Sequence, residues 1–205
     1  MIILGLLTAN ACAKETPIEK VIRVSEPKVV KIGIVSHRGS GVCSGAIISK
    51  TGIILTCAHC FDHKGIEKVF IKTSDGKVMP AQLLMIDMKK DLALIAPMHY
   101  SGVFPYFRPG HKPVVGQQVI SMGSPLGIAH TATVGWVSNL SEIAYVYHSA
   151  FISPGNSGGP LLDLRGDIIG INEASIGYGF LGLSEAVGLY IAISLDTIQK
   201  FLEGD

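Results

Sequence analysis

Charge is scarce in this sequence. Only 16% of its 205 residues are charged, and the formal net charge is +1. A chain so close to neutral has no electrostatic reason to bind nucleic acid or an anionic membrane surface, so we expect neither as a partner. Apolar residues make up 48% of the chain and glycine is abundant, with 24 residues. This composition favours a compact β-rich protein with many tight turns over a disordered one.

The N-terminus has no apolar run long enough to span a bilayer. The apolar segment at residues 2–11 ends in Ala9-Asn10-Ala11 and is followed by Cys12. Such a segment fits the core of a signal peptide with a small-x-small cleavage site, although no Lys or Arg precedes it. We therefore predict export to the periplasm or the exterior, with residues 1–27 as signal peptide and leader. Two alternatives stay open: lipidation of Cys12, which would anchor the protein to a membrane, and a buried or disordered N-terminal strand.

Sustained helical periodicity is missing until the C-terminus. Strand-like patterns occur instead, at residues 28–36, 42–49, 53–56, 67–73, 78–86, 92–96, 119–122, 131–140, 143–149, 160–164, 168–173 and 189–193. A stretch rich in Pro and Gly at residues 105–116 separates two halves, 28–112 and 113–205. Each half has about six strands, which suits a small barrel or a sandwich. The final segment predicts a helix capped by Ser194, with an apolar face made of Leu195, Ile198, Phe201 and Leu202.

Cysteine is also sparse, with Cys12, Cys43, Cys57 and Cys60. In an exported protein these residues suggest one or two disulfides, and in a cytosolic one they suggest free thiols or a metal site. Cys57 and Cys60 flank His59, but no second ligand pair stands at the spacing of a zinc finger. We therefore predict no metal.

Small and turn-forming residues gather in one hexapeptide, Gly155-Asn156-Ser157-Gly158-Gly159-Pro160. Glycine at these positions allows a backbone that turns tightly with another chain segment close against it. One interpretation is an ordinary surface turn. The other is a nucleophilic serine whose loop aims N–H groups at a developing oxyanion. The second requires a general base and an acid that orients it.

His59 and Asp91 are the candidates for those two roles. His59 follows the apolar strand at residues 53–56 and sits among small residues, next to a cysteine. Asp91 heads the apolar run at residues 92–95, where a carboxylate would lie at the rim of a core. Asp87 is a weaker rival because no apolar strand follows it directly.

The chain order of His59, Asp91 and Ser157 is that of the chymotrypsin fold. The stretches at residues 56–60, 91–94 and 155–160 resemble the three signature blocks of trypsin-like serine proteases. Further stretches resemble the bacterial HtrA/Deg branch, namely residues 123–127, 133–138, 166–172 and 190–194. The resemblance runs from residue 30 to residue 202. It implies an all-β fold of two six-stranded antiparallel β-barrels with a C-terminal helix.

The resemblance also implies a serine endopeptidase that cuts proteins or peptides through an acyl-enzyme, without a metal or other cofactor. Ser157 would attack the carbonyl, His59 would act as general base and then as acid, and Asp91 would orient the imidazole. The oxyanion hole is assigned to Gly155, Asn156 and Ser157, with the N–H groups of the first and last as donors.

Asn156 stands where digestive enzymes of this family carry an Asp that pairs with a newly cut N-terminus. An Asn cannot form that ion pair, so the resemblance favours the HtrA/Deg mode, in which loop rearrangement governs activity. It further implies a disulfide between Cys43 and Cys60, with Cys57 buried and free.

The substrate pocket would be walled by two short stretches, Phe151 and Ile152 on one side and Asn172, Glu173, Ala174 and Ser175 on the other. No Asp occupies the base of this pocket, so we expect a small or medium apolar side chain at the cleaved position rather than Lys or Arg. Glu173 would either point to solvent or narrow the pocket.

HtrA/Deg proteins often carry a peptide-binding PDZ module after the terminal helix, and here we expect none. Their trimer-forming segment is not recognisable, so no oligomeric state is predicted. Two other functions stay open. The chain would otherwise be a catalytically silent homologue that serves as a binding or assembly module, or a zinc protein built on Cys57, His59 and Cys60.

Overall fold

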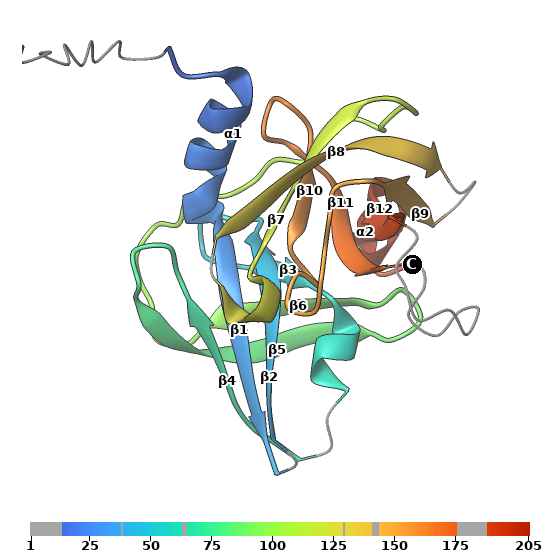
Figure 1. Cartoon of the computed structure of the whole chain (residues 1–205). Coiled ribbons are helices and arrows are strands. Elements are labelled where there is room, and N and C mark those ends of the chain that lie inside the picture. The colour runs from blue at the N-terminus through green and yellow to red at the C-terminus, as the bar shows by residue number, and fades with distance from the viewer. Residues whose placement is uncertain (1–13, 38, 63–64, 129, 141–143, 176–187) are drawn as a thin grey trace, which may run out of the picture.

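The chain forms two β-barrels that lie against each other. The computed structural model describes residues 14–37, 39–62, 65–128, 130–140, 144–175 and 188–205. Within these residues, each barrel is closed and contains six strands, with antiparallel pairing throughout the ladders, and a helix lies near each end of the chain (Figure 1). The predicted double barrel is confirmed. The apolar segment at residues 2–11 and Cys12 lie outside the described residues.

The first barrel closes in the order β1-β2-β3-β6-β5-β4. Its strands are β1 (Val29–Ser36), β2 (Gly39–Ile47), β3 (Ile54–Thr56), β4 (Ile66–Lys72), β5 (Val78–Asp87) and β6 (Leu92–Pro97). The apolar side chains that predicted these strands fill the barrel. Gly76 has φ +85° in the turn between β4 and β5, and its N–H donates to the carbonyl of Thr73 at 2.9 Å. The hairpin predicted from Asp75-Gly76 is therefore present, with glycine at the position that needs it.

The second barrel closes in the order β10-β11-β12-β9-β8-β7. Its strands are β7 (Gln118–Gly123), β8 (Thr131–Leu140), β9 (Tyr145–His148), β10 (Pro160–Leu162), β11 (Ile168–Ser175) and β12 (Tyr190–Ser194). The short 3₁₀ helices are η1 (Glu26–Lys28), η2 (Ala58–Phe61) and η3 (Pro125–Gly127). Two of them flank the site described below: η2 carries His59, and η3 precedes β8.

Helix α1 (Pro17–Ser25) forms in a segment where the sequence indicated only a polar leader. Thr16 caps it in a reciprocal capping box with Glu19, and Pro17 stands at its first position. Both features start helices for local reasons, independent of a long apolar face. Val21 then packs into the main core. Its nine residues equal those of α2, so its length is not the reason that it was missed; the segment was assigned to a polar leader and its capping box was overlooked.

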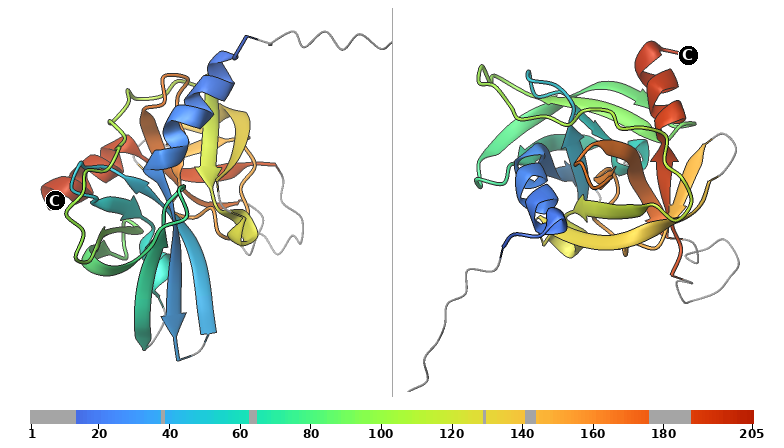
Figure 2. Two further views of the ribbon diagram at one scale, coloured as in Figure 1. Left: turned by 90° about the vertical axis from the view of Figure 1, so that its left-hand side faces the viewer. Right: turned by 90° about the horizontal axis from the view of Figure 1, so that it is seen from above.

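Helix α2 (Leu195–Glu203) was expected and is present. The Ser194 hydroxyl accepts a hydrogen bond from the N–H of Thr197, and Gly204 ends the helix at φ +84°. The two helices lie on different sides of the molecule (Figures 1 and 2). Among the described residues, no helix is long and apolar enough to cross a membrane.

The apolar core is continuous between the barrels. Buried residues of the first barrel, such as Leu55 and Ile95, belong to the same cluster as Ile120 and Leu162 of the second. A smaller cluster around Val146 fills the rest of the second barrel. Since burial of apolar area is the main favourable term in folding, the barrels are expected to fold as one unit, which fixes the cleft where they meet.

The assignment of Ser194 as the N-cap of α2 can be tested directly. Ser194→Ala removes the acceptor for the Thr197 N–H and should lower the free energy of unfolding by about 1 kcal/mol. Chemical denaturation measures the change. Gln199→Ala, on the exposed side of the same helix, serves as the control and should change stability by less than about 0.5 kcal/mol. Equal effects of the two substitutions would contradict the cap.

Candidate active site

His59 and Asp91 lie against each other at the edge of the first barrel. The Nδ1 atom of His59 is 2.7 Å from Oδ2 of Asp91, and the backbone N–H of His59 donates to Oδ1 at 2.7 Å. The N–H of Ala58 donates to the Asp91 carbonyl at 3.1 Å. The first contact holds the imidazole through Nδ1 and leaves Nε2 for another partner. The other two hold the backbone around His59 against Asp91. The side chains are 44% and 16% exposed respectively.

The charge of Asp91 governs the basicity of His59. The hydrogen bond that the His59 ring donates to the Asp91 carboxylate raises the pKa of His59 above its ordinary value, and burial of the ring opposes this shift. A nearby carboxylate stabilises the protonated imidazole. His59 is therefore a stronger base than a free histidine.

A disulfide between Cys43 and Cys60 joins β2 to η2. It closes a sequence separation of 17 residues and ties the turn that presents His59 to the barrel wall. This is the pairing that the resemblance implied. Cys57 is free and fully buried, and its Sγ donates to the carbonyl of Asn172 at 3.3 Å.

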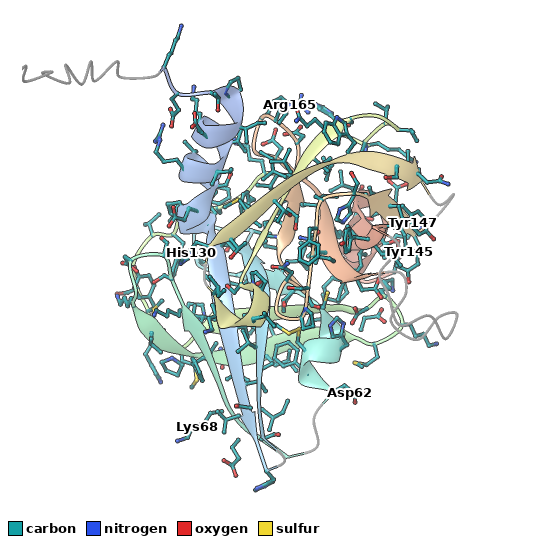
Figure 3. The ribbon with its side chains drawn as sticks, in the orientation of Figure 1. Asp62, Lys68, His130, Tyr145, Tyr147 and Arg165 are labelled. Atoms are coloured by element: carbon teal, nitrogen blue, oxygen red, sulfur yellow. A yellow bond between two sulfur atoms is a disulfide. The ribbon has the colours of Figure 1, made fainter. Side chains whose placement is uncertain are left out.

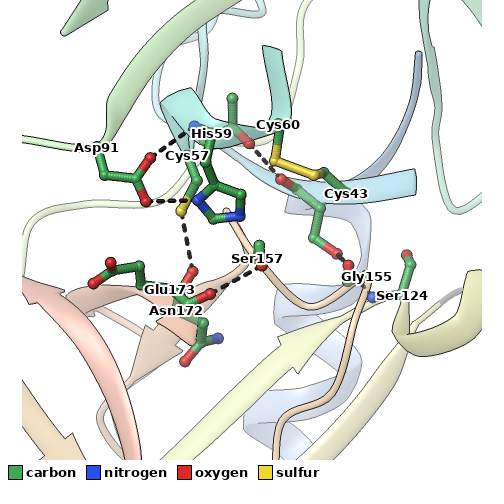
Figure 4. The surroundings of a disulfide bond; sticks show 12 residues. Cys43, Cys57, His59, Cys60, Asp91, Ser124, Gly155, Ser157, Asn172 and Glu173 are labelled. Atoms are coloured by element: carbon green, nitrogen blue, oxygen red, sulfur yellow. Dashed lines mark hydrogen bonds and ion pairs between the residues drawn. A yellow bond between two sulfur atoms is a disulfide. The ribbon is translucent and has the colours of Figure 1, made fainter. Parts of the chain in front are cut away.

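Ser157 lies across the cleft from His59, on the loop between β9 and β10. Figure 4 shows the imidazole between the Asp91 carboxylate and Ser157. The Ser157 hydroxyl donates to the carbonyl of Glu173 at 2.9 Å. The structure thus brings together the three residues that the sequence selected, with the serine hydroxyl turned toward β11. In the absence of substrate, the hydrogen bonds used in catalysis are often long or poorly aligned.

Ser44, on β2, holds the serine loop from the opposite barrel. Its Oγ donates to the carbonyl of Gly155 at 2.7 Å and accepts from the N–H of Ser124 at 2.8 Å. Its backbone N–H donates to the carbonyl of Ser157 at 2.9 Å. Ser44 is fully buried. Sequence reasoning missed this residue, because a serine within a predicted strand carries no signal of a role 111 positions further along the chain.

Two glycines of the loop are required by its shape. Gly155 and Gly158 have φ +103° and +85°, values that residues with a Cβ rarely adopt. A Cβ on Gly158 would also collide with the Thr56 hydroxyl and the Ser44 carbonyl. A Cβ on Gly155 would collide with the Ser124 carbonyl of its own barrel. The glycines thus allow a tight turn with other chain segments close against it, as expected from the sequence.

Hydrogen bonds fix the direction of each peptide in the loop. The carbonyl of Pro154 accepts from the N–H of Leu126 at 2.8 Å, and that of Asn156 accepts from Gly159 at 2.9 Å. In a trans peptide the next N–H points away from the carbonyl, so those of Gly155 and Ser157 point away from these contacts. Neither donates a hydrogen bond to any described residue. The N–H of Asn156, by contrast, donates to Ser153 at 3.0 Å.

The predicted pocket residues have different surroundings. Phe151 is 56% exposed and packs edge-on against the Tyr190 ring, with 5.6 Å between centroids, whereas Ile152 is buried. Asn172 is fully buried, and its amide donates to the Ser121 hydroxyl and the Pro160 carbonyl, so its side chain braces β7 and β10. The backbones of Ala174 and Ser175 pair with β12. The side chains of these last two residues lie outside what the structure describes.

His148 is a buried histidine next to Tyr190. It is fully buried at the end of β9, with its ring 6.0 Å from that of Tyr190. Neither ring nitrogen has a hydrogen-bond partner among the described residues. Burial lowers its pKa to about 4, against a weaker opposing effect of the Ala150 backbone. The imidazole is therefore neutral at physiological pH.

The zinc hypothesis loses one of its three ligands, because Cys60 is bonded to Cys43. Ligand atoms of Cys57, His59 and Asp91 do lie within 4.8 Å of one another. However, burial raises the pKa of the Cys57 thiol well above its ordinary value, and zinc binds the thiolate. The arrangement is better suited to proton transfer between His59 and a hydroxyl than to a metal.

Comparison with known proteins agrees with this geometry. Residues 39–171 match the family model of the trypsin-like peptidase domain. Curated relatives include the mitochondrial serine protease HTRA2 of Drosophila persimilis, 34% identical over 173 residues, and the serine protease HTRA1 of Xenopus tropicalis, 35% identical over 172 residues. A probable periplasmic DegP-like serine endoprotease of Hahella chejuensis is 34% identical over 163 residues. The crystal structure of a serine endoprotease from Yersinia pestis superposes with a TM-score of 0.79 at 27% identity.

The family model spans more than half of this chain, so the chain belongs to the trypsin-like peptidase family. Its relatives within that family are proteases of the HtrA and DegP type. The matches cover 78%, 78% and 74% of this chain but only 38%, 35% and 34% of the three curated relatives, in the order given above. The structural match covers 93% of this chain and 66% of the Yersinia chain.

The Ser44 contacts predict a specific sensitivity. Ser44→Ala would leave the Gly155 carbonyl and the Ser124 N–H unpaired in a buried place, and should lower the free energy of unfolding by about 1–3 kcal/mol. Ser40→Ala, on an exposed position of the same strand, is the matched control and should be nearly neutral. Thermal and chemical denaturation of the two variants measures this. If Ser44→Ala left the free energy of unfolding unchanged, the hydrogen bonds of the Ser44 hydroxyl would not be stabilising contacts.

Proposed function

We propose that this protein is an active serine endopeptidase in which Ser157, His59 and Asp91 form the catalytic triad. The observation that carries the proposal is the convergence of these side chains from two barrels. Asp91 and His59 are joined at 2.7 Å, and Ser157 lies near the imidazole with its hydroxyl on the Glu173 carbonyl (Figure 4). Membership of the trypsin-like peptidase family supports the same assignment.

In the proposed mechanism the Ser157 hydroxyl leaves the Glu173 carbonyl and turns to Nε2 of His59. His59 takes the hydroxyl proton as Oγ attacks the scissile carbonyl, and later delivers a proton to the leaving amine. Asp91 keeps Nδ1 protonated and stabilises the imidazolium. Water then hydrolyses the acyl-enzyme by the same route.

The oxyanion is assigned to the N–H groups of Gly155 and Ser157. Support comes from the peptide directions in the loop, which leave both groups without an acceptor in the described part of the chain. Each such donor typically contributes about 3–4 kcal/mol to stabilising the transition state. Asn156, whose N–H is already used within the turn, would hold the loop in shape. A loop of this form supports an oxyanion hole that is ready before substrate binds.

An apolar substrate preference follows from the walls of the pocket. The exposed ring of Phe151 packs against the buried ring of Tyr190, and His148 beside Tyr190 carries no charge at neutral pH. The homologues include a periplasmic DegP-like protease, so we extend the proposal to exported, including misfolded, protein substrates. The alternative remains a catalytically silent homologue that binds or assembles with other proteins.

Active-site labelling separates the two functions. A fluorophosphonate probe should label the wild-type protein and leave Ser157→Ala unlabelled, because only an activated serine reacts readily. In-gel fluorescence reads out the label, and Ser153→Ala, in the same loop, is the control that should still react. Absence of labelling in the folded wild-type protein would favour the silent homologue.

Digestion of a peptide library tests specificity. We expect cleavage after small or medium apolar residues, with Lys and Arg disfavoured by at least about tenfold, since an unpaired cation in an apolar pocket is costly. Mass spectrometry of the products identifies the cleaved bonds. A clear preference for Lys or Arg would refute the pocket assignment while leaving the triad intact.

A further inference from the structure

Glu173 occupies an irregular position in β11, directly after Asn172. In the ladder between β11 and β12, Asn172 pairs with Ala192 and Ala174 pairs with Ile191. Glu173 is the extra residue between those pairs, which makes it a β-bulge. Bulges change the direction in which a side chain points and occur often beside active sites. The bulge explains how a charged residue in a barrel strand comes to face the cleft.

The carboxyl group of Glu173 lies on the same side of His59 as Asp91 (Figure 4). The residue is half-buried, and its Oε2 atom is buried without a hydrogen-bond partner among the described residues. An unpaired buried carboxylate oxygen destabilises a fold. From the sequence, the Glu173 side chain was expected either to point to solvent or to narrow the substrate pocket. Neither placement explains why its Oε2 atom is buried.

Four titratable groups face this carboxyl. Asp91 comes from the turn before β6, His59 from η2 and Cys57 from the segment before η2. Tyr145, which is labelled in Figure 3, comes from β9. Burial raises the pKa of Glu173, the charge of Asp91 raises it further, and His59 lowers it. Among the four, only His59 becomes a cation. It is thus the group that an ionised Glu173 attracts.

We propose that Glu173 is a positioning residue of the proposed triad, whose ionised carboxylate joins Asp91 in stabilising the His59 imidazolium. The inference rests on the proposed function. As the bond forms between Ser157 Oγ and the substrate carbon, the hydroxyl proton passes to Nε2 and the negative charge moves to the substrate oxygen. Glu173 takes up no proton in this step. It acts by its charge alone, through His59.

The sign of the effect can be tested. An ionised Glu173 raises the pKa of His59, so removing the charge makes the imidazole a weaker base. In Glu173→Gln, the acid limb of kcat/KM against pH should move down by about 0.5–1 pH unit, as expected for a charge at several Å in a partly solvated site. The plateau should fall about threefold to tenfold, because proton transfer to a weaker base is slower.

Two matched variants accompany this measurement. Glu173→Asp keeps the charge and should restore most of the wild-type pH profile. Glu203→Gln, which removes an exposed carboxylate at the end of α2, should leave the profile unchanged. An acid limb in Glu173→Gln that coincides with that of Glu203→Gln would overturn the inference. A raised or lowered KM with an unmoved limb would also overturn it, and would place the side chain in the substrate pocket.

A second readout does not depend on activity. NMR titration of the His59 ring in a Ser157→Ala background should show the same downward shift in pKa when Glu173→Gln is added. An unchanged pKa of His59 in the folded double variant would refute the electrostatic interaction between Glu173 and His59. If the NMR shift appears but the wild-type protein hydrolyses no peptide, the interaction between Glu173 and His59 stands and the proposed function fails. The two failures are therefore distinguishable.

Discussion

The hydrogen bonds of Ser44 are the contact on which the geometry of the cleft depends. A side chain and a backbone group of the first barrel bind three backbone groups of the second, at Gly155, Ser157 and Ser124. The two hydrogen bonds of the Ser44 hydroxyl are buried, and buried hydrogen bonds are far more costly to break than they are favourable to form. The serine loop is thereby positioned relative to β2, the same strand that carries one end of the disulfide to η2. Ser157 and His59 are thus both held in place from the same strand, although they belong to different barrels.

The close approach that makes these bonds possible explains the composition of the loop. With the Ser44 carbonyl and the Thr56 hydroxyl directly against it, position 158 has no room for a Cβ. Gly155, which has a positive φ, is crowded instead by the backbone of Ser124 and Leu126 in its own barrel. Close contact therefore explains both glycines, but only the one at position 158 is set by the opposite barrel. A motif of this kind therefore predicts a contact as well as a turn.

The strands could be predicted from the sequence because the relevant signals are local, whereas the double barrel was implied by the resemblance to trypsin-like proteases. Alternating apolar residues, turn pairs such as Asp75-Gly76 and the Ser194 cap act within a few residues of themselves. The grouping of His59, Asp91 and Ser157 was predictable because each stands in a short, distinctive context and their order along the chain matches a known fold. Helix α1 also begins at a local signal, the capping box of Thr16 and Glu19, but this signal was overlooked in a segment assigned to the polar leader.

The parts of the site that could not be predicted depend on contacts between distant segments. Ser44 looks like any serine in a strand until the loop around Gly155 is placed beside it. Glu173 was recognised as a complication, but its direction is set by a bulge that arises from the mismatch between β11 and β12. Periodicity describes the regular strand and carries no information about where one extra residue is inserted.

Buried polar atoms without partners concentrate near the serine loop in the described structure, on Ser124, His148, Asn172 and Glu173. Each is expected to reduce stability, because a desolvated polar group without a hydrogen bond is unfavourable. Local violations of this sort are expected where function, rather than folding, determines the residue. Burial of the Glu173 carboxylate lowers the stability of the fold. The same burial strengthens the attraction of the carboxylate for a cation formed beside it. In solvent the charge of Glu173 would be screened, and it would have little influence on His59.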